Sequence, residues 1–167
     1  AIAPMVASVQ GVYTPQLVER GRQLAALGNC VHCHTAPGGA PLAGGRPIAT
    51  PFGTLHSTNL TPDLETGVGR WSLSAFQRAM REGVSRDGHH LYPAFPFNAF
   101  TQVGDDDLQA LYAWVMSQPA VRAEVPPNAL RFPFNLRPLM GLWNALHLRP
   151  GPVPARAATC MSPCARP

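Results

Sequence analysis

The sequence predicts an all-α domain of short helices joined by long loops. The chain has 167 residues, the usual size of one domain, and 46% of them are apolar, which is enough to build a core. Its 15 glycines and 19 prolines are about a fifth of the chain and interrupt it too often for a long coiled coil. Apolar residues recur at helical spacing in four segments, and none approaches the ~20 apolar residues that span a bilayer.

Each predicted helix has signals at its ends. The first follows the capping residue Thr14, has Pro15 at its first position and stops at Gly28. Gly21 lies in its middle, where glycine is costly, and therefore predicts a close crossing with another helix. The other helices are expected from the cap Ser72 to residue 82, from the three aspartates at 105–107 to the proline at 119, and over 135–147 with a proline in the first turn.

Residues 30–34 read Cys-Val-His-Cys-His. Two thiols three positions apart can each add across a vinyl group on one edge of a haem, and the histidine directly after the second thiol can then bind the iron. Cys30 and Cys33 are therefore the predicted attachment residues and His34 the predicted proximal iron ligand, while His32 is a spacer. The roughly forty residues after the motif are rich in turns and lack periodicity, as expected of a loop that wraps a bound group.

Zinc binding and thiol redox chemistry are the alternatives for this motif. A zinc site needs two further ligands, and Cys160 and Cys164 lie about 130 residues away in a proline-rich tail. A redox-active thiol pair is typical of a βαβ context, which the predicted helices do not supply. Both alternatives are much weaker than covalent haem.

Further short motifs extend along the chain. They are Cys-His-Thr-Ala-Pro-Gly-Gly at 33–39, Thr-Pro-Phe-Gly-Thr at 50–54, Ser-Thr-Asn-Leu-Thr-Pro-Asp at 57–63, Thr-Gly at 66–67, Trp71, Asp-Gly at 87–88, Leu-Tyr-Pro-Ala at 91–94, Phe-Pro-Phe-Asn at 132–135 and Trp143. In this combination the chain resembles the class I cytochromes c. More closely, it resembles the first haem domain of the multi-haem cytochrome subunits of periplasmic dehydrogenases.

The resemblance implies a class I cytochrome c fold with long haem-wrapping loops, extended here by a C-terminal helical segment. It implies one covalently attached haem c and a periplasmic, exported protein that carries electrons and is not itself a catalyst. The electron donor would be a subunit of a quinone-cofactor or molybdenum dehydrogenase, and the acceptor a quinone, a cytochrome or an oxidase. Association with the membrane surface stays open. The arginines are scattered at a net charge of +4, which gives no support for a nucleic acid partner.

The resemblance also marks residues around the haem. Asn59 and Thr61 become candidate partners of the haem propionates, with an ordinary role in turns as the alternative. Trp71 becomes a candidate haem contact, with packing in the core as its alternative.

Three segments are expected along the chain. Residues 1–12 form an N-terminal arm or the remnant of an export signal, 13–150 a single cytochrome c domain, and 151–167 a loosely ordered tail. In the subunits that this chain resembles, a second C-x-x-C-H domain comes next. This sequence has no second motif, as expected of either a one-haem subunit or a truncated product. Cys160 and Cys164 fit a local disulfide and free thiols equally well.

Phe95 departs from the pattern of the alcohol dehydrogenase subunits, which have the distal methionine at this position. Phenylalanine cannot bind iron, so another residue must supply the sixth ligand. Met80 and Met116 are expected to belong to the core and to a helix end, which leaves Met140, on the last apolar helix, as the predicted distal ligand. The histidine pair at 89–90 is one alternative. The other is an open distal site, typical of a ligand-binding sensor or a peroxidase-like protein.

Overall fold

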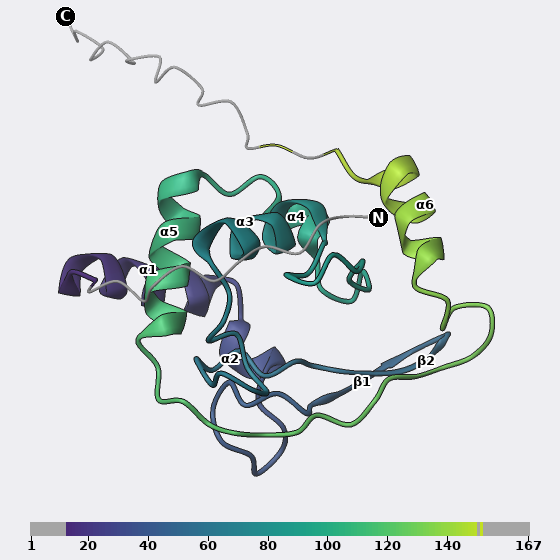
Figure 1. Cartoon of the computed structure of the whole chain (residues 1–167), viewed down its shortest axis with the longest axis horizontal. Coiled ribbons are helices and arrows are strands. Elements are labelled where there is room, and N and C mark those ends of the chain that lie inside the picture. Colours follow the sequence, from purple (N-terminus) through teal and green to yellow (C-terminus); the bar gives the residue numbers. More distant parts are fainter. Residues whose placement is uncertain (1–12, 150, 152–167) are drawn as a thin grey trace, which may run out of the picture.

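The computed structural model describes residues 13–149 and 151. Within them, helices α1 and α2 lead into a hairpin, and helices α3, α4 and α5 precede a third strand and a last helix, α6 (Figure 1). The elements are α1 Pro15–Leu27, α2 Cys30–Cys33, β1 Pro47–Thr50, β2 Gly53–His56, α3 Leu73–Glu82, α4 Phe97–Phe100, α5 Asp105–Met116, β3 Ala129–Leu130 and α6 Pro138–His147.

The expectation of an all-α domain omitted a small antiparallel sheet in the order β1-β2-β3. Ile48 pairs with Leu55 in the hairpin, and Thr54 of β2 pairs with Ala129 of β3. The strands are four residues or shorter, too short for an alternating pattern to be distinct from the surrounding turns. The sheet ties the start of the C-terminal segment to the loop that follows the thiol motif.

The core forms where α1 crosses α5. At Gly21 a β-carbon would lie 2.6 Å from the Cβ of Trp114 and closer still to the carbonyl oxygen of Ala110, so a side chain there has no room. This confirms the predicted close crossing. Leu108 and Ala25 are fully buried beside it, and the cluster extends to α3 through Phe76 and Met80.

The predicted helix ends are confirmed for the first two long helices. The Thr14 hydroxyl accepts from the backbone N–H of Leu17 at 3.3 Å, and that of Ser72 accepts from Ala75 at 3.1 Å. Gly83 ends α3 in the left-handed conformation (φ +63°), which costs glycine little. Sequence signals at caps are local, and this is why they locate these ends well.

The last helix begins at Pro138, three residues later than expected. The backbone N–H of Phe134 donates to Arg131, and that of Leu136 donates to Pro133, so residues 131–136 form turns. The helix packs on the rest of the domain through Trp143, whose ring meets that of Phe97 edge to face at 5.8 Å. The helix also carries exposed leucines at 139, 142 and 146. In Figure 1 α6 stands apart from α1 and α5.

No helix among the described residues has the length and apolar character needed to cross a membrane. The expected arm at 1–12, the tail from 152 onward and the pair Cys160 and Cys164 lie outside the described residues, so the expectations for them stay untested.

Candidate functional site

The two thiols of the motif lie on one short helix. After Gly28 ends α1, Asn29 adopts the left-handed conformation (φ +55°) and the chain turns directly into α2. Both Cys30 and Cys33 are free thiols. Cys30 is half-buried against the core, and this burial raises the pKa of its thiol, whereas Cys33 is exposed.

His34 follows Cys33 directly, and a hydrogen bond orients its imidazole ring. Its Nδ1 lies 2.7 Å from the main-chain carbonyl oxygen of Thr58. A carbonyl can only accept, so Nδ1 carries the proton and the lone pair is on Nε2. Burial lowers the pKa of His34 although the hydrogen bond to Thr58 opposes the shift, and the ring is therefore neutral near pH 7.

These residues fit a covalently bound haem. The two thiols stand one helical turn apart and are not joined to each other, so both are available for thioether bonds. His34 offers an unprotonated Nε2 as an iron ligand, with its other nitrogen bonded to a carbonyl, as metal-binding histidines generally have. Phe95 and Phe100, whose rings stack at 5.3 Å, are half-buried beside the core and supply apolar surroundings.

The loop after Thr58 is fixed by a network of side chains. The amide nitrogen of Asn59 donates to the Thr66 hydroxyl at 3.0 Å and to the carbonyl of Val121 at 2.8 Å. Its carbonyl oxygen accepts from both the backbone and the hydroxyl of Thr61, at 2.9 and 2.7 Å. The polar atoms of Asn59 are thus engaged within the protein, and its expected contact with a propionate stays a prediction.

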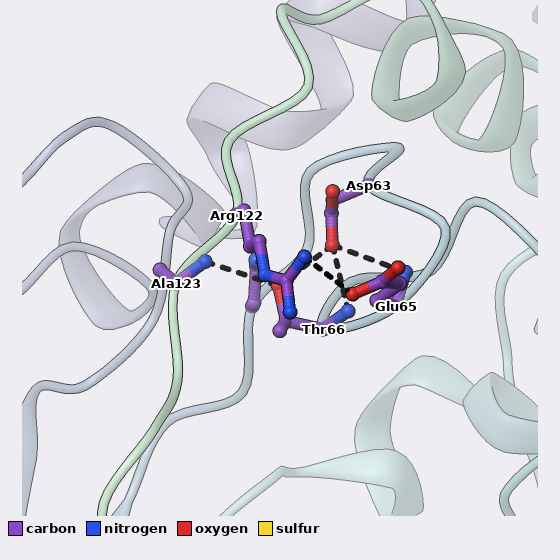
Figure 2. A network of polar contacts seen from close by, with 6 residues as sticks. Asp63, Glu65, Thr66, Arg122 and Ala123 are labelled. Atoms are coloured by element: carbon purple, nitrogen blue, oxygen red, sulfur yellow. Dashed lines mark hydrogen bonds and ion pairs between the residues drawn. The ribbon is translucent and has the colours of Figure 1, made fainter.

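The network continues to the surface (Figure 2). Asp63 accepts from the backbone and hydroxyl of Thr66, and Thr66 accepts from the backbone N–H of Ala123. The hydrogen bonds from Thr66, together with the nearby Arg122, lower the pKa of Asp63. Arg122 also pairs with Glu65 at 2.7 Å. Loop 59–66 and segment 121–123 are therefore fastened together along their length.

Trp71 is half-buried and packs on the core. Its main-chain carbonyl accepts from the Tyr112 hydroxyl at 2.7 Å, which agrees with the packing alternative. Its ring also lines a pocket of about 450 Å³ together with Arg70 and Arg86. The haem contact expected of Trp71 remains a prediction.

The methionines fall into two groups. Met80 and Met116 are buried in the core cluster, as expected. Met140 is half-buried on α6, next to Gly141. The distal role of Met140 stays a prediction.

His90, the alternative ligand, is engaged with α6. A β-carbon at Gly141 would lie 2.9 Å from its Nε2, so the ring packs on the helix backbone. Its Nδ1 lies 3.4 Å from the amide nitrogen of Asn144, which also donates to the carbonyl of Glu82 at 3.0 Å. Arg137 donates to the carbonyl of His90 at 2.9 Å. These contacts join the loop that contains Phe95 to α6.

Sequence reasoning missed three contributors to this site. They are the carbonyl of Thr58, the backbone N–H of Gly44, which donates to the carbonyl of His34 at 2.7 Å, and the amide of Asn144. Backbone acceptors have no sequence signature, so Thr58 could not have been found. Gly44 belongs to the turn-rich segment. Asn144 lies on the mostly apolar last helix, where it and His147 are the two polar residues, and this was the available signal.

The comparisons with known proteins agree on one family. The family model described as Cytochrome c matches residues 18–119. The chain is 58% identical over 160 residues to a nicotinate dehydrogenase subunit of Pseudomonas putida KT2440, covering 94% of this chain and 14% of that protein. It is 44% identical over 131 residues to the gluconate 2-dehydrogenase cytochrome c subunit of Pantoea cypripedii, covering 78% of this chain and 30% of the relative.

A third relative is named a dihaem protein. It is the diheme cytochrome c-type of Cereibacter sphaeroides, 34% identical over 132 residues, with 76% of this chain and 45% of the relative covered. The chain thus spans less than half the length of each of these three relatives.

Proposed function

The chain belongs to the cytochrome c family, and from this premise we propose that it is a mono-haem electron carrier that serves a periplasmic dehydrogenase. The observation that supports this most directly is the geometry at residues 30–34. Two free thiols stand on one helical turn, and a neutral histidine beside them donates its Nδ1–H to Thr58. Relatives named as cytochrome subunits of gluconate, alcohol and fructose dehydrogenases support a dehydrogenase as the donor.

Cys30 and Cys33 would hold the haem. Each S–H would add across one vinyl C=C of the haem, forming a C–S bond and a C–H bond with no leaving group. His34 would bind the iron through Nε2, and the Thr58 carbonyl would keep its ring in that tautomer. The bound haem supplies a one-electron couple between ferric and ferrous iron, whose potential the protein sets by ligand, burial and hydrogen bonding.

The protein residues around this group are suited to transfer and not to substrate chemistry. Cys30 packs, half-buried, against a core of aromatic and aliphatic side chains. The electron donor is proposed to be the dehydrogenase subunit and the acceptor a quinone, a cytochrome or an oxidase, in the periplasm. Contact with the membrane surface is left as an option for the assembled complex.

A redox titration tests this function. The full chain, matured in a haem-competent periplasm, should titrate as a single reversible one-electron step with one haem per chain. A chain without visible absorbance, or one that takes up two haems, would contradict the proposal.

A second candidate is supported by Phe95. Its ring stacks on Phe100 at 5.3 Å and offers no donor atom where the resembling alcohol dehydrogenase subunits have methionine. If no other residue reaches the iron, the site is open to a small ligand or a peroxide. A low-spin ferric spectrum supports the electron carrier, and a high-spin spectrum that changes on addition of cyanide or peroxide supports the open site.

A further inference from the structure

We propose that Asn59 is a positioning residue for the axial ligand: it holds the Thr58 carbonyl on the ring of His34 and so lowers the reduction potential of the bound haem. The inference rests on the proposed function, since it requires His34 to bind the iron. Asn59 contacts neither the His34 ring nor a thiol through any hydrogen bond of the described residues. It would act through the peptide group that it shares with Thr58.

The Thr58–Asn59 peptide is first fixed by the backbone on both sides. The N–H of Gly45 donates to Ser57 and that of Leu60 donates to Leu42, each at 2.8 Å. Gly44 lies between these bonds with φ +76°, and a β-carbon there would approach the carbonyl carbon of Thr58 and the nitrogen of Asn59 at 2.6 Å. The same glycine donates its N–H to the carbonyl of His34 at 2.7 Å.

The side chain of Asn59 provides the second support. It is 2% exposed, and all of its hydrogen-bonding capacity at Nδ2 and Oδ1 is directed to Thr61, Thr66 and Val121. The Asn59 side chain bridges two segments 62 residues apart in the sequence. Rotation of the Thr58–Asn59 peptide would break these buried hydrogen bonds and leave buried polar atoms without partners, which is unfavourable.

Segment 121–123, to which Asn59 is tied, begins just beyond residues 18–119 that match the cytochrome c family model. Val121 and Ala123 each use a backbone N–H to bond a threonine hydroxyl of loop 59–66. Further along the chain, β3 pairs with β2, and Arg137 next to α6 donates to the carbonyl of His90. The position of the Thr58 carbonyl therefore depends on residues 121–123, which lie outside the part of the chain that matches the family model.

The physical consequence concerns the basicity of the ligand. A firm hydrogen bond from Nδ1–H to a carbonyl makes the imidazole a stronger donor to the metal, which favours ferric over ferrous iron. If the Thr58 peptide is fixed less firmly, the hydrogen bond from the Nδ1–H of His34 lengthens, so the reduction potential of the haem should rise. A residue with a merely structural role would alter stability and leave the potential where it was.

Two variants of the haem-loaded full chain test the inference. Asn59→Ala removes the bridge. Thr66→Val keeps the side-chain shape and removes the hydroxyl that accepts from Asn59 and Ala123 and donates to Asp63. In both we expect the ferric–ferrous equilibrium to shift towards ferrous by about two- to tenfold, where tenfold equals ~59 mV for one electron. In proton NMR of the reduced protein, the Nδ1–H of His34 should exchange with solvent several-fold faster.

Two matched controls define the result. Thr66→Ser keeps the hydroxyl, and Glu65→Gln breaks the exposed ion pair with Arg122 between the same two segments. Both should keep the wild-type potential. If Asn59→Ala does not fold, Thr66→Val decides.

The inference is overturned if Thr66→Val is destabilised but keeps the wild-type potential and the wild-type exchange of the His34 ring proton. This outcome is distinct from failure of the proposed function, in which the wild-type chain itself would carry no haem or show no one-electron step.

Discussion

The Nδ1–H of His34 points at the main-chain oxygen of Thr58, 24 residues further along the chain, with 2.7 Å between nitrogen and oxygen. This contact fixes the tautomer of the histidine before any ligand binds. It also links the thiol motif on α2 to the loop that Asn59 and Thr66 fasten to segment 121–123. The arrangement of the site is thus a property of the fold and not of the five-residue motif alone.

Asp63 should contribute to stability only while it is ionised. Hydrogen bonds from Thr66 lower its folded-state pKa below the usual 3.8, so its contribution is present above that value and is lost as the pH falls through the folded-state pKa. We expect Asp63→Asn to be less stable than wild type at pH 7 and the difference to shrink below about pH 4. Urea unfolding of both proteins from pH 7 to pH 3 measures this stability difference.

The control for this variant is Glu124→Gln, which removes an exposed carboxylate outside the network. A stability difference for Asp63→Asn that stays constant from pH 7 to pH 3 would show that the charge of Asp63 is irrelevant.

Gly21→Ala should destabilise the domain by about 3 kcal/mol or more. A β-carbon there has no space against Ala110 and Trp114, and α1 and α5 would have to separate. Thermal and urea unfolding check this, with Gln23→Ala on the exposed face of the same helix as the control. Equal stability of Gly21→Ala and wild type would mean that the two helices do not cross this closely.

How far the sequence could predict the fold depended on the range of the interactions. Thr14, Ser72 and Gly83 mark helix ends through bonds to residues within four positions, and these ends were predicted correctly. The helix α2 has only four residues, too few to show a helical period, and the strand pair of Thr54 with Ala129 depends on a contact that only the folded chain makes. Helices dominate as predicted, but the sheet was missed.

The sequence predicts residues for the candidate site but does not predict the contacts that support them. The motif at 30–34 was evident because three side chains carry the chemistry at fixed spacing. Asn59 was found as a motif residue, yet its partner Val121 is 62 positions away and uses a backbone carbonyl, which has no sequence signal. The identity of the distal ligand depends on which side chain the fold brings to the iron, and sequence spacing does not determine that.

Met140→Leu tests the predicted distal ligand. Leucine keeps the volume and removes the sulfur, so the ferric spectrum should change from low-spin towards high-spin and the potential should fall. Met80→Leu and Met116→Leu are the controls, because both residues are buried in the core, and they should cost less than about 1.5 kcal/mol without changing the spectrum. An unchanged spectrum and potential in Met140→Leu would exclude this ligand and make His90 the next residue to replace.

The isolated chain should not oxidise alcohols or aldehydes. It is proposed to accept electrons from a separate catalytic subunit, and the sequence shows no nucleophile–base arrangement of the triad kind. Steady-state assays with an artificial electron acceptor measure this directly. Turnover of either substrate class by the purified chain would refute the assignment as a carrier.

The central claim is that Cys30 and Cys33 bind one haem covalently, and the mass of the denatured protein tests it most directly. For the full chain matured in a haem-competent periplasm, mass spectrometry should give the polypeptide plus one haem, and the Cys30→Ala, Cys33→Ala double variant should give the polypeptide alone. A wild-type mass without haem under the same conditions would contradict the claim.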